Sequence, residues 1–294
     1  MSTTKHARVA VLGAGLIGLD LIGKIQQSAA LDCRLVVGRS SQTLGLARAA
    51  QMGCETAAGG ITALLKQGPF DIVFDASNAD SHAEHWAHLE GTGAALIDLT
   101  PAPIGTMVVP TVNGTEARSL RHINLVSCGG QAAVPVLHAI TQHCAPAYVE
   151  VVCTGASASA GRATRLNLDQ YIATTAAAVR AFTEAPEVKV MVNLSPARPE
   201  PPFRVAITVL TDQVQPVPVR AAVEAAAHQV RTFAPGFAVT SLQVSDGRIS
   251  AVVEVTAEGG RIPRYAGNLD IINAAAVLLA QQHAAARGEV ETAS

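Results

Sequence analysis

Apolar runs alternate with amphipathic segments in the N-terminal part of the chain. The runs that predict buried strands cover residues 9–12, 35–37, 71–75 and 94–98. Apolar residues recur at helical spacing over residues 16–29 and 82–89. Strands that are buried on both faces and alternate with helices are typical of a parallel, doubly wound sheet. We therefore predict an α/β fold that opens with a Rossmann-type sheet.

The pattern changes near residue 127. A helical segment at 131–143 precedes strand-forming segments at 148–154, 188–193, 204–210 and 248–256, with helices at 169–182 and 217–232. These strands alternate more clearly and predict a mixed or antiparallel sheet. The last helix, from 269 to about 286, is apolar enough to pack on the first domain. Because 294 residues can enclose two cores, we predict domains at 1–127 and 128–267 and a returning helix at 268–294.

A glycine loop follows the first strand directly. Gly13-Ala-Gly-Leu-Ile-Gly18 matches G-x-G-x-x-G between a strand and a helix. The first glycine permits the tight turn, the second lets a pyrophosphate approach the backbone, and the third lets helix and strand pack closely. Any α/β protein can place glycines in a tight turn, but strand, loop, helix and second strand arrive here in order. We predict dinucleotide binding by Gly13, Ala14, Gly15, Leu16, Ile17 and Gly18.

The end of the second strand carries a cation where an acid is usual. NAD-specific Rossmann domains place an acidic side chain there for the ribose hydroxyls. Here the strand runs into Gly38-Arg-Ser-Ser41. A guanidinium such as Arg39, helped by Ser40, can bind a 2′-phosphate through paired hydrogen bonds. We predict that NADP is accepted at least comparably to NAD; the alternative is that Arg39 points into solvent or stacks on adenine.

A cysteine opens the second domain. In Asn124-Leu-Val-Ser-Cys-Gly-Gly-Gln131, Cys128 stands between an apolar run and a helical segment. A helix N-terminus lowers a thiol pKa and makes the sulfur nucleophilic, and the glycines leave room for a substrate. The alternative is a buried, inert cysteine. His138 lies about 15 Å further along the same helix, so the sequence names no general base.

The other cysteines and the histidines show no metal pattern. No C-x-x-C pair occurs, and an odd count of five cysteines does not indicate a disulfide framework. His82, His85 and His88 lack zinc-site partners, so we interpret them as a solvated helix face and predict no metal. Asp98 and Thr100 follow a parallel strand, where they either meet a ligand or hold the turn before Pro101.

The charge and hydropathy of the chain exclude some functions. A formal net charge of −2 with dispersed charges leaves no basic face for nucleic acid. The apolar stretch at residues 274–280 is far shorter than the roughly 20 residues of a membrane span. Residues 1–6 are polar, unlike a signal peptide. We expect a cytoplasmic protein.

Several motifs together resemble one family. Besides the glycine loop they are Gly45-Leu-Ala-Arg-Ala49, Asp71-Ile-Val-Phe-Asp-Ala76, Leu96-Ile-Asp-Leu-Thr-Pro-Ala102, Val126-Ser-Cys-Gly-Gly-Gln-Ala132, Ser159-Ala-Gly-Arg-Ala-Thr-Arg-Leu-Asn167 and Tyr265-Ala-Gly-Asn-Leu-Asp-Ile271. The sequence resembles the acylating, CoA-dependent acetaldehyde dehydrogenases, which act with 4-hydroxy-2-oxovalerate aldolase in the meta-cleavage breakdown of aromatic compounds. The likeness extends over nearly the whole chain.

The resemblance implies an activity and a site. A short aldehyde would be oxidised with NAD(P), and CoA would release the acyl group from a thioester on Cys128. The second domain would be catalytic and would form a homodimer, with an aldolase as a further partner. The residues that would line the cofactor site are Ser159, Ala160, Gly161, Arg162, Ala163, Thr164, Arg165, Leu166, Asn167 and Asn268.

Three departures from the family pattern stand out. Arg162 and Ala163 replace an expected proline and glycine, Val205 replaces an aspartate after Arg204, and the region between 244 and 253 is short by roughly twenty residues. Two alternatives follow: a non-acylating semialdehyde dehydrogenase of the same architecture, or a catalytically impaired nucleotide-binding subunit of an aldolase complex. The intact motif around Cys128 argues against the second.

Overall fold

The computed structural model describes residues 6–259 and 261–293. The chain forms two compact units, one of residues 1–125 with 273–294 and one of residues 126–272. The junctions fall two residues before and five residues after the predicted domain bounds at 127/128 and 267/268. The first junction therefore places Val126 and Ser127, which precede Cys128, in the same unit as that cysteine.

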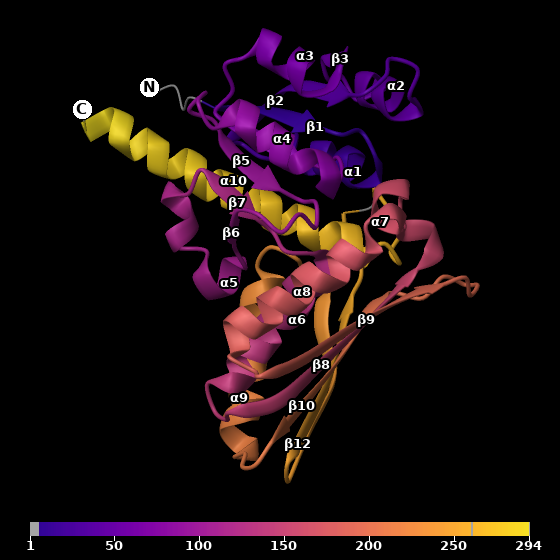
Figure 1. Ribbon diagram of the computed structural model, residues 1–294, viewed down its shortest axis with the longest axis vertical. Coiled ribbons are helices and arrows are strands. Elements are labelled where there is room, and N and C mark those ends of the chain that lie inside the picture. Colours follow the sequence, from indigo (N-terminus) through magenta and orange to yellow (C-terminus); the bar gives the residue numbers. More distant parts are fainter. Residues whose placement is uncertain (1–5, 260, 294) are drawn as a thin grey trace. The chain divides into compact units, whose positions relative to one another are not determined.

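A seven-stranded sheet forms the centre of the first unit (Figure 1). Its order is β3-β2-β1-β4-β5-β7-β6, and every pairing is parallel, which confirms the predicted doubly wound sheet. The strands are β1 (Ala7–Leu12), β2 (Leu31–Gly38), β3 (Thr56–Ala58), β4 (Ile72–Asp75), β5 (Ala95–Asp98), β6 (Thr106–Met107) and β7 (His122–Asn124). The order reverses between β1 and β4, and ligands of such sheets bind beyond the strand ends at this point.

Helices follow the strands of this sheet. They are α1 (Leu16–Ile25), α2 (Leu44–Gln51), α3 (Gly60–Gln67), α4 (Ala79–Leu89) and α5 (Pro110–Asn113), with a 3-10 turn at Glu116–Ser119. Apolar side chains of β1, β2, β4 and β5 pack with Ile61 and Leu64 of α3 and Leu89 of α4 in one buried cluster. The continuous apolar runs of the sequence are thus strands that are buried in the core.

The C-terminal helix returns to the first unit, as the sequence predicts. It is α10 (Gly267–Ala293), and the part from Asn273 onward belongs to this unit. The Asn273 amide donates hydrogen bonds to Asp20 Oδ2 at 2.8 Å and to the Ile17 carbonyl at 3.1 Å, both on α1. Gln281 Nε2 donates to Ser28 Oγ at 2.9 Å. Buried hydrogen bonds of this kind fix the register of the two helices.

The second unit holds a five-stranded mixed sheet in the order β11-β12-β10-β8-β9. Within this sheet β8 and β9 pair in parallel, and the other pairings of its described strands are antiparallel. The strands are β8 (Pro146–Ala156), β9 (Glu187–Ser195), β10 (Phe203–Thr211), β11 (Phe237–Ser245) and β12 (Arg248–Val255). Strand β11 was not predicted, because its polar residues and a register shift between Val239 and Ser241 break the alternation.

One face of this sheet carries the long helices. They are α6 (Cys128–Thr141), α8 (Leu168–Thr183) and α9 (Pro216–Arg231), and α6 packs against both of the others. Side chains on the opposite face, such as Val152, Ala206 and Val252, are only half-buried. None of the helices in the described part of the chain is long and apolar enough to cross a membrane.

Candidate active site

The glycine loop has the geometry that a phosphate cradle needs. Gly13 has φ 101°, a backbone conformation that residues other than glycine rarely adopt. A Cβ added to Gly18 would lie 2.0 Å from the Gly13 carbonyl oxygen, so the loop and α1 can pack only with glycine there. A Cβ added to Gly15 would meet nothing within 4 Å. Gly15 therefore leaves open space beside the N-terminus of α1, where anions bind favourably.

Arg39 lies next to this loop. It is exposed and follows β2, whose Val37 carbonyl accepts a hydrogen bond from Gly13 N at 2.8 Å. Ser40 helps to shape the turn, since its carbonyl accepts from Thr43 Oγ1 at 3.2 Å and Thr43 caps α2. The sequence-predicted pair Arg39 and Ser40 thus lies at the strand end that adjoins the glycine loop.

Cys128 is the first residue of α6. Ser127 caps the helix by accepting from Gly130 N at 2.9 Å. Val126, just before the cap, has φ 63°, which is an uncommon and strained conformation for a β-branched residue. Strain of this kind is retained where the surrounding structure requires one particular backbone path. Here it turns the chain from β7 into a helix whose first side chain is the thiol.

A tyrosine missed by sequence reasoning lies against this thiol. Tyr171 Oη is 3.3 Å from Cys128 Sγ and accepts a hydrogen bond from Gly129 N at 2.8 Å. Cys153 of β8 approaches the same point, because a Cβ on Gly129 would lie 2.4 Å from both Cys153 Sγ and Tyr171 Oη. The partners are distant in sequence, so only the helical spacing of Tyr171 and Thr175 on a buried face of α8 could have signalled them.

The surroundings of Cys128 keep it protonated. Burial raises the pKa of the thiol to about 11, although hydrogen bonds from Tyr171 and Gly129 lower it in part. The prediction that the helix N-terminus gives a low pKa is therefore wrong. The physical reason is that loss of water around sulfur outweighs a partial charge of the helix dipole. His138 gives no help, since its Nδ1 faces the Phe182 carbonyl at 3.3 Å.

The predicted cofactor loop from Ser159 to Asn167 turns on itself. Arg162 begins the short helix α7 (Arg162–Leu166) and is exposed. Arg165 donates to the carbonyls of Ser157, at 2.7 Å, and of Ala160, at 3.1 Å. These bonds hold the loop together through Nε and Nη2 of the guanidinium.

Two buried side-chain amides of this unit, Asn167 and Asn268, each have one atom without a hydrogen-bond partner in the described part of the chain. Among the described residues, nothing hydrogen-bonds to Asn167 Nδ2 or Asn268 Oδ1. Asn268 Nδ2 donates to the Ser159 carbonyl at 3.3 Å, which joins the start of α10 to the predicted cofactor loop. An unpaired buried amide group is costly unless a ligand or water completes it.

Val205 replaces the carboxylate expected from the family pattern. It is fully buried in β10 and pairs with Cys153 of β8. Both side chains lie on the helix-covered face of the sheet, the face that also bears the Cys128 and Tyr171 contacts. An apolar side chain at this position cannot move a proton.

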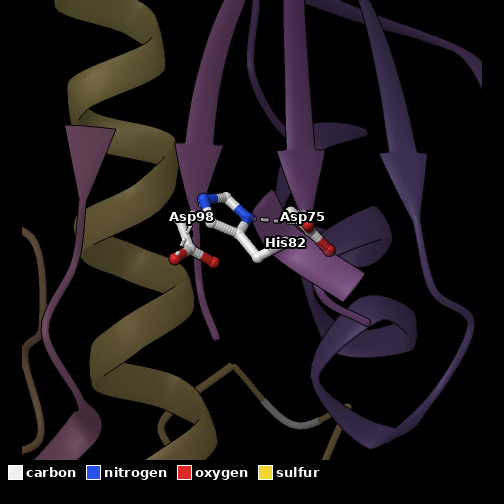
Figure 2. Close-up of side chains that lie close together, drawn as sticks. All are labelled: Asp75, His82 and Asp98. Carbon is white, nitrogen blue, oxygen red and sulfur yellow. Dashed lines mark hydrogen bonds and ion pairs between the residues drawn. The ribbon is translucent and has the colours of Figure 1, made fainter. Parts of the chain in front are cut away.

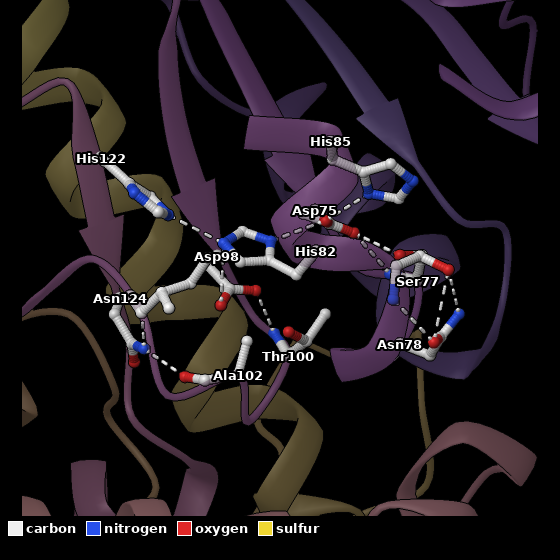
Figure 3. A network of polar contacts seen from close by, with 12 residues as sticks. Asp75, Ser77, Asn78, His82, His85, Asp98, Thr100, Ala102, His122 and Asn124 are labelled. Carbon is white, nitrogen blue, oxygen red and sulfur yellow. Dashed lines mark hydrogen bonds and ion pairs between the residues drawn. The ribbon is translucent and has the colours of Figure 1, made fainter. Parts of the chain in front are cut away.

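A second polar cluster lies at the carboxyl ends of β4 and β5 (Figure 2). His82 Nδ1 is 2.8 Å from Asp75 Oδ2, and His82 Nε2 is 3.3 Å from Asp98 Oδ2. The cluster extends to His85, 2.6 Å from Asp75, and to His122, 2.8 Å from His82 (Figure 3). The interpretation of a solvated helix face is wrong for His82 and His85, which are buried, and fits only the exposed His88.

The spacing of α4 explains this correction. Ala79, His82, His85 and Leu89 form its buried stripe, and the carboxylate of Asp75 makes burial of the two imidazoles tolerable. Ser77 N and Oγ also donate to Asp75, at 3.0 and 2.5 Å. Burial acts to raise the pKa of Asp75, but hydrogen bonds from His82 and His85 outweigh it and hold that pKa below its usual range.

Asp98 differs from its neighbour. Its Oδ1 accepts from Thr100 N at 2.7 Å, so it holds the turn after β5. Burial and the charge of Asp75 raise the pKa of Asp98 well above its usual range. One possible ligand atom each of Asp75, His82 and Asp98 lies within 4.8 Å of the others. The expectation of no metal stays a prediction.

Comparisons with known proteins agree with this geometry. The fold matches aspartate semialdehyde dehydrogenase II from Vibrio cholerae, solved in complex with ASA, with TM-score 0.64 and 15% identity over 95% of this chain and 98% of that one. A probable aspartate-semialdehyde dehydrogenase from Pseudomonas aeruginosa gives TM-score 0.68 at 15% identity, over 94% and 98%. The chain therefore has the two-domain fold of these structures.

Proteins with similar sequences show the family to which the chain belongs. Residues 128–263 match the family described as prokaryotic acetaldehyde dehydrogenase, dimerisation. Acetaldehyde dehydrogenase of Streptomyces griseus is 51% identical over 98% of this chain and 94% of its own length. Acetaldehyde dehydrogenase 1 of Comamonas testosteroni is 39% identical over 96% and 94%. The chain belongs to the acetaldehyde dehydrogenase family, an oxidoreductase family that uses a nicotinamide cofactor, and the resemblance noted from the motifs is confirmed.

Proposed function

We propose that this chain oxidises a short aldehyde such as acetaldehyde to its acyl-CoA, with NAD(P) and CoA, through a thioester on Cys128. The observation that carries the proposal is the position of Cys128 at the first turn of α6, with hydrogen bonds to the sulfur from Tyr171 and Gly129 and with two glycines, Gly129 and Gly130, directly after it. The named relatives support the reaction class and do not favour a non-acylating or inactive protein.

The residues present fit a dinucleotide. The turn at Gly13 and the close packing at Gly18 admit only glycine, and the open space at Gly15 leaves room for a pyrophosphate. The residues that we assign to the cofactor are those of the glycine loop, with Arg39 and Ser40 toward the ribose. When bound, the nicotinamide supplies the two-electron oxidant that converts the Cys128 adduct into a thioester.

The chain's own residues perform the other steps. Cys128 loses its proton to solvent, and its sulfur attacks the aldehyde carbon, so that a C–S bond forms while the carbonyl π pair moves to oxygen. The hydrogen on that carbon would leave as a hydride to the oxidised nicotinamide as the C=O bond forms again. After oxidation, the thiol of CoA loses its proton to solvent and its sulfur attacks the thioester carbonyl carbon; the C–S bond to Cys128 breaks, and Cys128 leaves as a thiolate. The buried, unpaired polar atoms of Asn167 and Asn268 support a polar ligand in the same unit.

Substitution of the nucleophile tests the proposal. Cys128→Ala should abolish aldehyde oxidation and leave nicotinamide binding nearly unchanged. Mass spectrometry after mixing enzyme, aldehyde and oxidised cofactor without CoA should show an acyl adduct on Cys128. Cys144→Ala, which removes another half-buried thiol, is the matched control and should keep activity. An adduct on a different cysteine, or an active Cys128→Ala variant, would refute the assignment.

The position of Arg39 supports dual cofactor use. The exposed guanidinium at the end of β2 can reach a 2′-phosphate that an acidic residue would repel. We expect kcat/KM for NADP to be at least comparable to that for NAD, and Arg39→Asp to shift the ratio toward NAD by more than about tenfold. Strong NAD preference in the parent enzyme, unchanged by the substitution, would contradict this role. Arg34→Asp, on the same strand, is the control.

Assembly is the remaining part of the proposal. The half-buried apolar side chains on the open sheet face, and the match to a dimerisation family, support a homodimer. Family membership supports a complex with 4-hydroxy-2-oxovalerate aldolase in the cytoplasm, because a reactive, volatile aldehyde is better passed between sites than released. Co-elution of the co-expressed proteins in size-exclusion chromatography is expected; separate elution at micromolar concentration would exclude a stable complex.

A further inference from the structure

A buried phenol lies against the Cys128 sulfur. Tyr171 lies on α8, is 7% exposed, and places Oη 3.3 Å from Cys128 Sγ. Among the described residues, the titratable side chains that interact with this thiol are Tyr171 and Cys153 of β8. No histidine or carboxylate of the described part of the chain shares that contact.

The available protons determine the direction of the hydrogen bond between Tyr171 Oη and Cys128 Sγ. Gly129 N–H already donates to Tyr171 Oη at 2.8 Å, so the phenol acts as an acceptor on that side. Its single proton remains available for a second partner. Once Cys128 is ionised the sulfur has no proton, and the bond at 3.3 Å can only run from the phenol to sulfur.

A chain of hydrogen bonds ties the backbone of Tyr171 to the N-cap of α6. Gly130 N donates to Ser127 Oγ at 2.9 Å, Ser127 Oγ lies 2.6 Å from Thr175 Oγ1, and Thr175 Oγ1 donates to the Tyr171 carbonyl at 2.6 Å. Tyr171 and Thr175 are four residues apart and face the same way on α8. The N-cap of α6 is thus tied to the helix turn that bears the phenol, so the two move together.

We propose that Tyr171 is a catalytic residue whose hydroxyl donates a hydrogen bond to the Cys128 thiolate, both when it attacks the aldehyde and when CoA expels it. The phenol keeps its proton throughout, so no atom or electron changes place on Tyr171. The inference rests on the proposed function of Cys128. Burial raises the pKa of Tyr171 well above its usual range, in agreement with a donor rather than a base.

Alkylation tests this role without turnover. Iodoacetamide reacts with the thiolate, so the rate at Cys128, followed by peptide mass spectrometry, reports its ionised fraction. In Tyr171→Phe the rate between pH 7 and 9 should fall about tenfold, which corresponds to a pKa higher by about one unit. Both kcat and kcat/KM should fall by a similar factor. Tyr148→Phe, which removes a hydroxyl bonded to Glu150 on the same unit, should change neither.

The outcomes separate the two hypotheses. If Cys128→Ala is inactive but Tyr171→Phe keeps the parent alkylation profile, the role of Tyr171 is wrong and the nucleophile stands. If kcat alone falls, the phenol acts on something other than the thiolate and the inference is again wrong. Cys153→Ala removes the competing acceptor and should leave alkylation of Cys128 unchanged or faster, while a slower rate would assign the donor to Cys153. An unchanged thermal midpoint in Tyr171→Phe shows that the fold is intact.

Discussion

The two polar centres of this protein handle buried ionisable groups in opposite ways. At the ends of β4 and β5, Asp75 is held ionised by His82, His85 and Ser77, which use both of its oxygens. At the start of α6, Cys128 and Tyr171 are both kept neutral, since burial raises the pKa of each. A charge that is fully hydrogen-bonded can be permanent, whereas a thiol with few donors must be ionised at the moment it reacts.

The ionised cluster around Asp75 and the neutral pair of Cys128 and Tyr171 should therefore serve different purposes, the first stability and the second activity. Asp75 ends the strand beside Leu12 and directly precedes Ala76, whose carbonyl would lie 2.4 Å from a Cβ on Gly13. The ionised cluster thus supports the backbone on which the glycine loop rests. Cys128 and Tyr171 are uncharged in the folded protein and therefore add no ion pair to its stability. Their arrangement matters when a negative charge forms on the Cys128 sulfur during the reaction. We expect substitutions at the first centre to act mainly on unfolding and those at the second mainly on turnover.

Removal of the permanent charge should have the largest effect. Asp75→Ala leaves His82, His85 and Ser77 without their buried acceptor, and breaking such a buried network costs about 3–5 kcal/mol. Urea unfolding should show this loss in the free energy of unfolding. Asp80→Ala, an exposed acid in the first turn of α4, is the control and should cost under about 1 kcal/mol. Equal losses in the two variants would show that the cluster does not stabilise the fold.

A substitution that crowds the contact between Cys128 and Tyr171 should have the second-largest effect. In Gly129→Ala the new Cβ would meet Cys153 Sγ and Tyr171 Oη, each at 2.4 Å, so the phenol must move away from sulfur. Misplacement by about 1 Å costs on the order of 100-fold in rate, and kcat/KM should fall by that factor. Gly155→Ala is the control, because its Cβ would make only ordinary contacts, 3.6 Å from Phe203. Activity within about threefold of the parent would show that the phenol position is not required.

The same contrast shows what the sequence could predict. The turn at Gly13 and the helix that begins at Cys128 depend on neighbours in the chain, so local patterns predicted a tight turn and a helix in these places. The pKa of Cys128 depends on Tyr171, 43 residues away, and on burial by β8, which no local pattern shows. His82 lies between these cases. The sequence interpretation of a solvated face was wrong for it, although His82 shares a helical stripe with Ala79 and Leu89, because its partners Asp98 and His122 come from distant strands.

The smallest expected effect is a pH dependence at the edge of the charged cluster. His122 stacks on Trp86 with ring centroids 4.3 Å apart and contacts His82, and burial, together with His82, lowers the pKa of His122 to about 4. The unfolded chain takes up a proton on this histidine near pH 6.5, whereas the folded chain does not until about pH 4, so stability is lost as the pH falls through that window. Because His122 is half-exposed, solvent screening limits its contribution to about 1 kcal/mol.

His122→Asn, which cannot titrate, isolates this contribution. The free energy of unfolding measured between pH 7 and 4 should fall by about 1 kcal/mol less in the variant than in the parent. The informative quantity is the difference between the stability curves of the parent and the variant, because other groups contribute to each curve. The raised pKa of Asp98 increases stability as the pH falls, and the lowered pKa of Asp75 decreases stability below about pH 4. His88→Asn, an exposed histidine on α4, should give the parent's slope. If His122→Asn also keeps that slope, His122 titrates alike in the folded and unfolded chains, and the charged cluster ends at His82.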